Sequence, residues 1–167
     1  MSNIEIERKF LLKSIPDLDP DDMIEINQFY FKNSLGIWER ARSWESKYTG
    51  DIKYVHTIKK NISKASSIED EYFLTLDEFN LFKEKCFELS NESKFISKTR
   101  FIYKSSDLKW EVDLFKNDYR LIIAEIEIPS EDHDLFIDDF IENLILLEVT
   151  GMKPFSNRSL ALKIKKK

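Results

Sequence analysis

The sequence contains very little cysteine, glycine and proline. Its 167 residues include one cysteine, three glycines and four prolines. Because Cys86 is the single thiol, an internal disulfide framework is excluded and a reducing compartment is expected. The scarcity of glycine and proline predicts few sharp chain breaks and little linker.

The chain also lacks long apolar runs, an N-terminal leader pattern and an excess of basic residues. No uninterrupted apolar stretch approaches the length that spans a membrane, and acidic residues begin at Glu5, unlike a signal peptide. The formal net charge of -5 argues against a general nucleic-acid binder. We therefore expect a soluble, cytoplasmic protein with no membrane and no nucleic-acid partner.

The composition allows one globular domain over residues 1–167. Hydrophobic residues make up 42% of the chain and aromatic residues 13%, which is enough for a sizeable core. Charged residues make up 34%.

Alternating hydrophobic and polar residues predict strands along most of the chain. The turn residues Asn33–Gly36 predict a hairpin between two of them. The acidic segment 17–22, the polar segment 45–53 and the Ser-rich segment 63–67 are predicted to connect strands. The predicted strands cover residues 4–12, 24–31, 37–44, 53–60, 69–73, 95–104, 109–115, 121–128 and 146–150.

Helical signals are fewer. Thr75 and Glu78 have capping-box spacing, which predicts a helix to about Leu89. Its apolar stripe includes Cys86, interpreted as a buried core thiol. A second helix is predicted from Ser130 to about Asn143, and a short third helix from Ser156. Without a steady alternation of strand and helix, a parallel doubly wound sheet is not expected. The predicted fold class is α+β, mainly β, with antiparallel strands and two to three helices.

The charged residues follow the strand period. In residues 4–10, Glu5, Glu7 and Lys9 share one face of a strand, and apolar residues occupy the other. Later strands repeat this pattern, and nearly every stripe has one sign. These stripes predict a sheet curled around a charged interior, with the apolar faces covered by the helices. The later stripes are Arg40 and Arg42, Thr57 and Lys59, Glu69 and Glu71, Lys98 and Arg100, Glu111 and Asp113, and Glu125 and Glu127.

A charged interior requires a charged ligand, because isolated buried charges are costly. Arginine and lysine match phosphate oxygens. Clustered carboxylates suit a hard cation such as Mg²⁺ or Mn²⁺. Both in one cavity indicate a polyphosphate site.

At this level the sequence resembles the CYTH domain family, also called the triphosphate tunnel metalloenzymes. The Glu5-x-Glu7-x-Lys9 signature carries the resemblance together with six further blocks in the family's order. These blocks are Glu39–Arg42, Thr57–Lys59, Lys98–Arg100, Trp110–Asp113, Ala124–Glu127 and Glu148–Gly151.

The resemblance implies an eight-stranded antiparallel closed tunnel and chemistry on triphosphates. It implies metal ligation by Glu5, Glu7, Asp113, Glu125 and Glu127, and catalytic roles for Glu5, Glu7, Lys9 and Glu127. It implies that the substrate triphosphate is bound by Lys9, Arg40, Arg42, Lys59, Lys98 and Arg100. Glu69, Glu71, Glu111 and Glu148 are possible additional site residues.

The sequence departs from the family pattern before the acidic pair Glu69 and Glu71. Many relatives carry a basic residue there, whereas this chain has Ser66, Ser67 and Ile68. One phosphate contact is therefore expected to be missing unless Lys64 replaces it. His56 and His133 are interpreted as structural or surface residues.

The function predicted from the sequence is metal-dependent hydrolysis of a small triphosphate, with inorganic triphosphate as the first choice. Metal-activated water would attack the terminal phosphorus. The alternatives are a class IV-type adenylate cyclase, a thiamine triphosphatase with an aromatic wall from Tyr30, Trp38 and Trp44, and a non-catalytic polyphosphate-binding module. A monomer or homodimer is expected.

Overall fold

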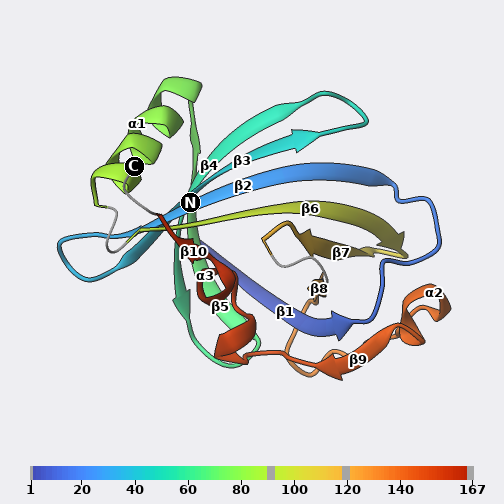
Figure 1. Ribbon diagram of the computed structural model, residues 1–167. Coiled ribbons are helices and arrows are strands. Elements are labelled where there is room, and N and C mark those ends of the chain that lie inside the picture. Colours follow the sequence, from blue (N-terminus) through green and yellow to red (C-terminus); the bar gives the residue numbers. More distant parts are fainter. Residues whose placement is uncertain (1, 90–92, 118–120, 165–167) are drawn as a thin grey trace.

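The computed structural model describes residues 2–89, 93–117 and 121–164, and over these ranges the chain is mainly β-structure (Figure 1). The strands are β1 (Ser2–Leu12), β2 (Asp22–Lys32), β3 (Trp38–Ser46), β4 (Ile52–Asn61), β5 (Ser66–Leu74), β6 (Lys94–Ser105), β7 (Leu108–Phe115), β8 (Ile122–Glu127), β9 (Ile145–Glu148) and β10 (Leu162–Lys163). The helices are α1 (Leu76–Glu88), α2 (Asp139–Glu142), α3 (Asn157–Leu160) and the 3-10 turn η1 (Lys153–Phe155).

Eight strands form a closed antiparallel barrel. The hydrogen-bonded order is β6-β2-β3-β4-β5-β1-β8-β7, and the pairing of β6 with β7 closes the ring. β9 extends the sheet beside β1, and β10 extends it beside β6. The eight-stranded antiparallel tunnel expected from the sequence is confirmed.

The hairpin of β2 and β3 illustrates how the sequence sets the register. Its strands pair from Ile24 opposite Ser46 to Lys32 opposite Trp38. In the turn, the Asn33 side-chain oxygen accepts hydrogen bonds from the backbone N–H groups of Leu35 and Ile37, both 3.0 Å long. Gly36 completes the turn at a φ of +76°, which favours glycine.

Helix α1 covers one outer face of the barrel. The predicted capping box is present, because Thr75 accepts from the Glu78 N–H and Glu78 accepts from the Thr75 N–H. Buried Phe79 and Cys86 pack on a cluster with Phe29 and Phe31 of β2. Cys86 is therefore a core thiol, as predicted.

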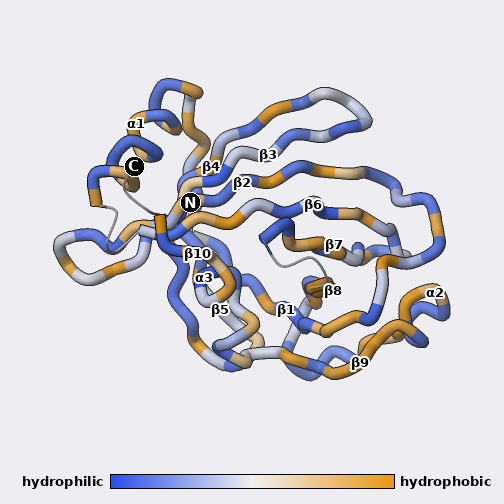
Figure 2. Tube along the Cα trace, in the orientation of Figure 1, coloured by the Kyte–Doolittle hydropathy of each residue, from blue (hydrophilic) through white to orange (hydrophobic). Residues whose placement is uncertain are grey.

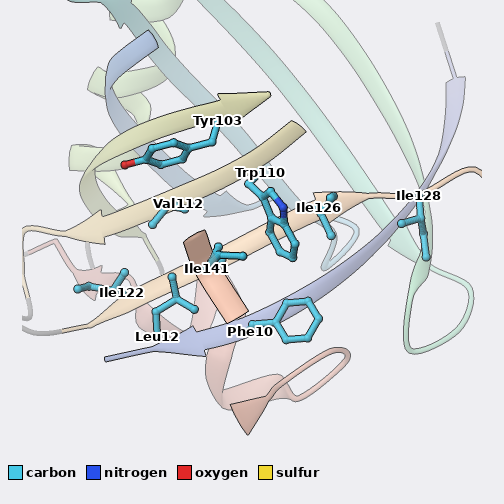
Figure 3. Packing of buried hydrophobic residues seen from close by; sticks show 10 residues of the cluster. Phe10, Leu12, Tyr103, Trp110, Val112, Ile122, Ile126, Ile128 and Ile141 are labelled. Carbon is cyan, nitrogen blue, oxygen red and sulfur yellow. The ribbon is translucent and has the colours of Figure 1, made fainter. Parts of the chain in front are cut away.

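A different layer covers β1, β7 and β8. Here α2 and β9 lie on the side of the barrel away from α1, and β9 pairs with β1 (Figures 1 and 2). Figure 3 shows Ile141 of α2 among Phe10, Leu12 and Trp110. The covering layer is thus largely extended chain.

The long second helix predicted for residues 130–143 is wrong. Only α2 is helical there, and Asp138 is extended at a ψ of 144°. The Asp138 carboxylate accepts hydrogen bonds from Ser105 Oγ at 2.6 Å and Trp110 Nε1 at 2.8 Å. These contacts fix the segment against the barrel, and Leu135 and Ile137 pack at strand-like spacing on the core. Tertiary contacts therefore override the apparent helical stripe.

One connection between strands differs from the sequence prediction, and two other predictions fall partly or wholly outside the described residues. Ser66 and Ser67 belong to β5 and pair with Ile6 and Glu5, so the Ser-rich connection is shorter than predicted. A turn predicted at Asn117–Asp118 and a tail predicted at Lys165–Lys167 lie partly or wholly outside the described residues. Within those residues, every helix is too short or too polar to cross a membrane.

Candidate active site

The barrel encloses a charged cavity of about 630 Å³. A second cavity of about 530 Å³ opens beside the turn between β6 and β7. Both have Glu5, Glu7, Lys109, Glu111, Glu125 and Glu127 in their walls, so the acidic residues lie where the two meet. Among the residues predicted from the sequence, the larger cavity is lined by Glu5, Glu7, Lys9, Arg40, Arg42, Lys59, Glu69, Glu71, Arg100, Glu111, Glu125 and Glu127.

The strand register assembles the acidic wall. Glu7 of β1 is opposite Glu127 of β8, and Lys9 is opposite Glu125. Glu125 is in turn opposite Glu111 of β7. Directly opposite residues of an antiparallel pair share a face, so three strands bring their charged stripes to one wall.

Lys59 compensates part of this negative charge. Its Nζ lies 3.1 Å from Glu5 Oε2, 3.4 Å from Glu69 Oε1 and 3.7 Å from Glu7 Oε1. Burial opposes the ammonium charge, but Glu7, Glu5 and Glu69 together raise the pKa of Lys59 above its ordinary value. The lysine is therefore charged throughout the neutral range.

The pKa values of Glu7 and Glu125 are shifted in opposite directions. Burial, and then the charge of Glu125, raises the pKa of Glu7 to about 8. Burial disfavours the charge of Glu125 as well, but Lys9 and Arg100 hold its pKa well below the ordinary value. Lys9 Nζ lies 3.4 Å from Glu125 Oε1. At neutral pH the pair therefore carries a neutral Glu7 beside an ionised Glu125.

The basic wall contains two arginines with unused donors. The Nε atoms of Arg40 and Arg42 are buried and have no hydrogen-bond partner among the described residues. Burial, and then the charges of Arg40 and Arg100, lowers the pKa of Arg42 to about 10. Unsatisfied buried donors are costly, and both arginines also bring positive charge to the wall of the larger cavity.

Lys98 and Asp113 are inside the barrel but do not line either cavity. Both side chains are 0% exposed, and Lys98 Nζ donates to Asp113 Oδ2 at 2.7 Å. Arg100 donates to both oxygens of Asp113, at 2.7 and 2.9 Å. The structure therefore places these two predicted site residues behind Arg100.

Glu148 lies outside the tunnel. Arg8 Nε and Nη2 donate to its two carboxylate oxygens at 2.8 and 3.0 Å. Arg8 alternates with the cavity-lining residues of β1, so this bidentate pair fastens β9 to the outer face of the barrel.

Of the remaining residues considered from the sequence, one lines the cavity and two do not. Lys64 lines the larger cavity, so it is close enough to take the place of the basic residue missing before Glu69. His56 lies on the outer face, with its Nε2 2.9 Å from Glu39 Oε1 and its ring beside Phe82 of α1. His133 lies in a turn in which its N–H donates to the Ser130 carbonyl oxygen.

Sequence reasoning missed two parts of the cavity wall. Lys109 lines both cavities, and its two-residue spacing from Glu111 was an available signal. The C-terminal segment 152–159, which follows the matching block Glu148–Gly151, also lines the larger cavity, through residues such as Ser156 and Arg158. Its low periodicity gave no signal, because the segment reaches the cavity through turns rather than a strand.

The acidic wall supplies oxygen ligands only. Over the described ranges, no three Asp, Glu, His or Cys side chains are already gathered as a metal-binding group. Mg²⁺ is usually held by one or two carboxylates together with substrate phosphates, so the wall suits a cation that arrives with its substrate.

Comparison with solved structures identifies the architecture. The protein NE1496, solved twice, matches with a TM-score of 0.58 and 25% identity over 96% of this chain, and the match covers 99% and 95% of those chains. The chain therefore has the fold of the CYTH, or triphosphate tunnel, proteins. One of the NE1496 structures is described as an inorganic triphosphatase.

More distant solved structures share the fold alone. PH1819 from Pyrococcus horikoshii matches with a TM-score of 0.54 and 15% identity, covering 77% of this chain and 80% of its own. A putative adenylate cyclase from Bacillus halodurans matches with a TM-score of 0.52 and 15% identity, covering 85% of this chain and 97% of its own. No family model and no curated protein matches the sequence.

Proposed function

We propose that this protein is a divalent-cation-dependent triphosphatase that hydrolyses inorganic triphosphate. The main support for the proposal is the pair of guanidinium groups of Arg40 and Arg42 that line a cavity whose other wall is acidic. A linear triphosphate supplies anionic oxygens to those donors. Similarity to the inorganic triphosphatase NE1496 over nearly the whole chain supports the same substrate.

The basic residues bind and orient the substrate. Arg40 and Arg42 contact phosphate oxygens through their forked guanidinium groups, which match oxyanions in geometry. Lys9, Lys59 and Arg100 line the same cavity and stabilise the negative charge that develops in phosphoryl transfer. Asp113, which also accepts a hydrogen bond from Lys98, fixes Arg100 in position.

The acidic residues would hold the cation. Glu5, Glu7, Glu125 and Glu127 all line the cavity, and their oxygen-only donors fit Mg²⁺ or Mn²⁺. When bound, such a cation polarises phosphate oxygens and lowers the pKa of a coordinated water. A cation held there would compete with Lys59 for Glu5 and Glu7, and Lys59 would then be available to contact the substrate.

Hydrolysis proceeds by attack of water on the terminal phosphorus. The new bond joins the water oxygen to phosphorus, the phosphoanhydride bond breaks, and the products are orthophosphate and pyrophosphate. The proton of the water passes to a carboxylate of the acidic wall. Glu127 is our candidate, because partial loss of hydration and nearby Glu5 raise its pKa above the ordinary value, although the residue stays open to solvent.

The test compares wild type with Glu127→Gln. Phosphate release from inorganic triphosphate should require Mg²⁺ or Mn²⁺, stop with chelator, and fall at least about 100-fold in the variant, as expected for loss of a general base. The Lys60→Ala variant, changed on the outer face of β4, is the control for handling and folding. Full activity of Glu127→Gln would remove this residue from the mechanism, and triphosphate binding without any product would favour a binding module.

A further inference from the structure

A group of basic side chains surrounds Trp38 at one end of the cavity. Lys32 Nζ and Lys94 Nζ lie 5.3 and 5.6 Å from the Trp38 ring centre, and the Arg158 guanidinium carbon lies 5.3 Å from it. Trp38 and Arg158 belong to the wall of the larger cavity. We call these four residues, together with Lys163, the basic collar.

The strand register forces the collar together. Lys32 is directly opposite Trp38 on β3, and Lys94 is directly opposite Lys163 on β10. Like charges directly opposite each other destabilise a sheet. The fold therefore contains a repulsive pair of like charges, Lys94 and Lys163, at this position.

Among the described residues, no carboxylate relieves that repulsion. Within residues 2–89, 93–117 and 121–164, the structure contains no ion pair of Lys32, Lys94, Arg158 or Lys163. Burial, and then the charges of Arg158, Lys163 and Lys32, lowers the pKa of Lys94. An anion bound at the collar would offset this repulsion between the basic side chains.

The collar continues the basic wall of the tunnel. Arg42, Arg40 and Trp38 are every second residue of β3 and share its inner face. Two residues of a strand advance about 6.8 Å. Tyr30, opposite both Arg40 and Lys94, connects this row to the collar across β2. A linear polyanion bound along Arg42 and Arg40 would therefore leave the cavity past Trp38.

We propose that the basic collar binds the additional phosphoryl groups of linear condensed phosphates longer than triphosphate. The inference rests on the proposed function, because it places the first three phosphoryl groups at Arg40 and Arg42. Three cations already surround the Trp38 ring, so the collar suits a phosphate chain better than a stacked nucleobase or thiamine ring.

The test measures equilibrium binding by calorimetry in the presence of chelator, where no turnover is expected. The probes are inorganic tetraphosphate, inorganic triphosphate and orthophosphate. Wild type should bind tetraphosphate at least about tenfold more tightly than triphosphate, the gain expected of one added charge-assisted contact. The Lys32→Ala/Arg158→Ala variant should lose this ratio.

The matched control is Lys13→Ala/Lys60→Ala, which removes two exposed lysines away from the collar and makes the same change in net charge. The control should keep the tetraphosphate preference. If both double variants keep it, or if wild type has none, the proposal is overturned. A change confined to orthophosphate binding also overturns it, because the collar would then hold only a separate ion.

One feature separates this test from the test of the proposed function. Binding is measured without hydrolysis, so a protein that prefers tetraphosphate but hydrolyses nothing would contradict only the proposed activity. If the double variant does not fold, as judged by circular dichroism, Lys32→Ala alone replaces it, since the Lys32 side chain is exposed. A single variant that keeps the full preference would equally overturn the proposal.

Discussion

Arg100 holds Asp113 through two hydrogen bonds, from Nε at 2.7 Å and from Nη2 at 2.9 Å. Lys98 adds a third contact to the same carboxylate at 2.7 Å. Both Asp113 oxygens are therefore engaged inside the barrel wall, and Arg100 is fixed in position at the cavity. The family pattern implies a metal ligand at Asp113, whereas the geometry favours a positioning residue.

This arrangement predicts that Asp113→Ala mainly affects stability. Removing one partner of a buried ion pair leaves uncompensated charge and typically costs about 3–5 kcal/mol. We expect a loss of that size in the free energy of unfolding measured in urea. Glu127→Ala, at an exposed position, should lose less than about 1 kcal/mol. An Asp113→Ala protein of wild-type stability that fails to bind Mn²⁺ would identify Asp113 as a ligand instead.

Arg42→Ala should weaken substrate use without abolishing cation binding. A hydrogen bond to a charged group contributes about 1.5–3 kcal/mol, so kcat/KM for inorganic triphosphate should fall about 10- to 150-fold. Mn²⁺ binding, followed by electron paramagnetic resonance, should be unchanged because the acidic wall is intact. Wild-type kcat/KM in this variant would show that the substrate does not reach the basic wall.

The raised pKa of Glu7 predicts how stability depends on pH. Between its ordinary pKa of 4.5 and its folded-state pKa of about 8, the folded protein keeps a proton that the unfolded chain has lost. The contribution of Glu7 to stability is therefore fully present below pH 4.5 and is lost as the pH rises toward 8.

Glu7→Gln should remove this loss, because the amide stays neutral and can still donate to Glu125. In urea titrations with chelator, the variant should match wild type near the acidic end of that range. At the alkaline end it should exceed wild type by at least about 1.4 kcal/mol, which corresponds to one pKa unit. A constant difference at every pH would mean that Glu7 is ionised in the folded protein.

Gly151 should be more sensitive to substitution than Gly36. Both have positive φ, at +69° and +76°, but a Cβ at Gly151 would lie 2.7 Å from the Lys64 Cβ and 2.8 Å from its backbone. A Cβ at Gly36 would meet nothing within 4 Å. Gly36→Ala should therefore cost about 1–2 kcal/mol of unfolding free energy from the backbone alone, and Gly151→Ala should cost about 1–3 kcal/mol more from overpacking. Equal losses would contradict the close approach of the two turns.

Much of the barrel could be predicted because its strands have a strict two-residue period. Glu5, Glu7 and Lys9 on one face and Ile6 and Phe10 on the other already require a strand with a polar and an apolar side. Repetition of such stripes required a polar interior, which the closed sheet provides.

The parts that could not be predicted depend on contacts between distant segments. Asp138 reaches Ser105 and Trp110, and no local pattern reveals that this keeps residues 133–138 out of a helix. Periodicity also gives only the face on which a side chain lies. It placed Asp113 in the interior, but whether its carboxylate faces the cavity or Arg100 is decided by packing.

Product analysis with purified wild-type protein and Mg²⁺ or Mn²⁺ distinguishes an inorganic triphosphatase from the alternatives. Inorganic triphosphate, ATP and thiamine triphosphate would be compared, with orthophosphate, pyrophosphate and cyclic AMP all quantified. We predict cation-dependent release of equal amounts of orthophosphate and pyrophosphate, fastest from inorganic triphosphate. Formation of cyclic AMP and pyrophosphate from ATP, or no product from any of the three, would contradict the account.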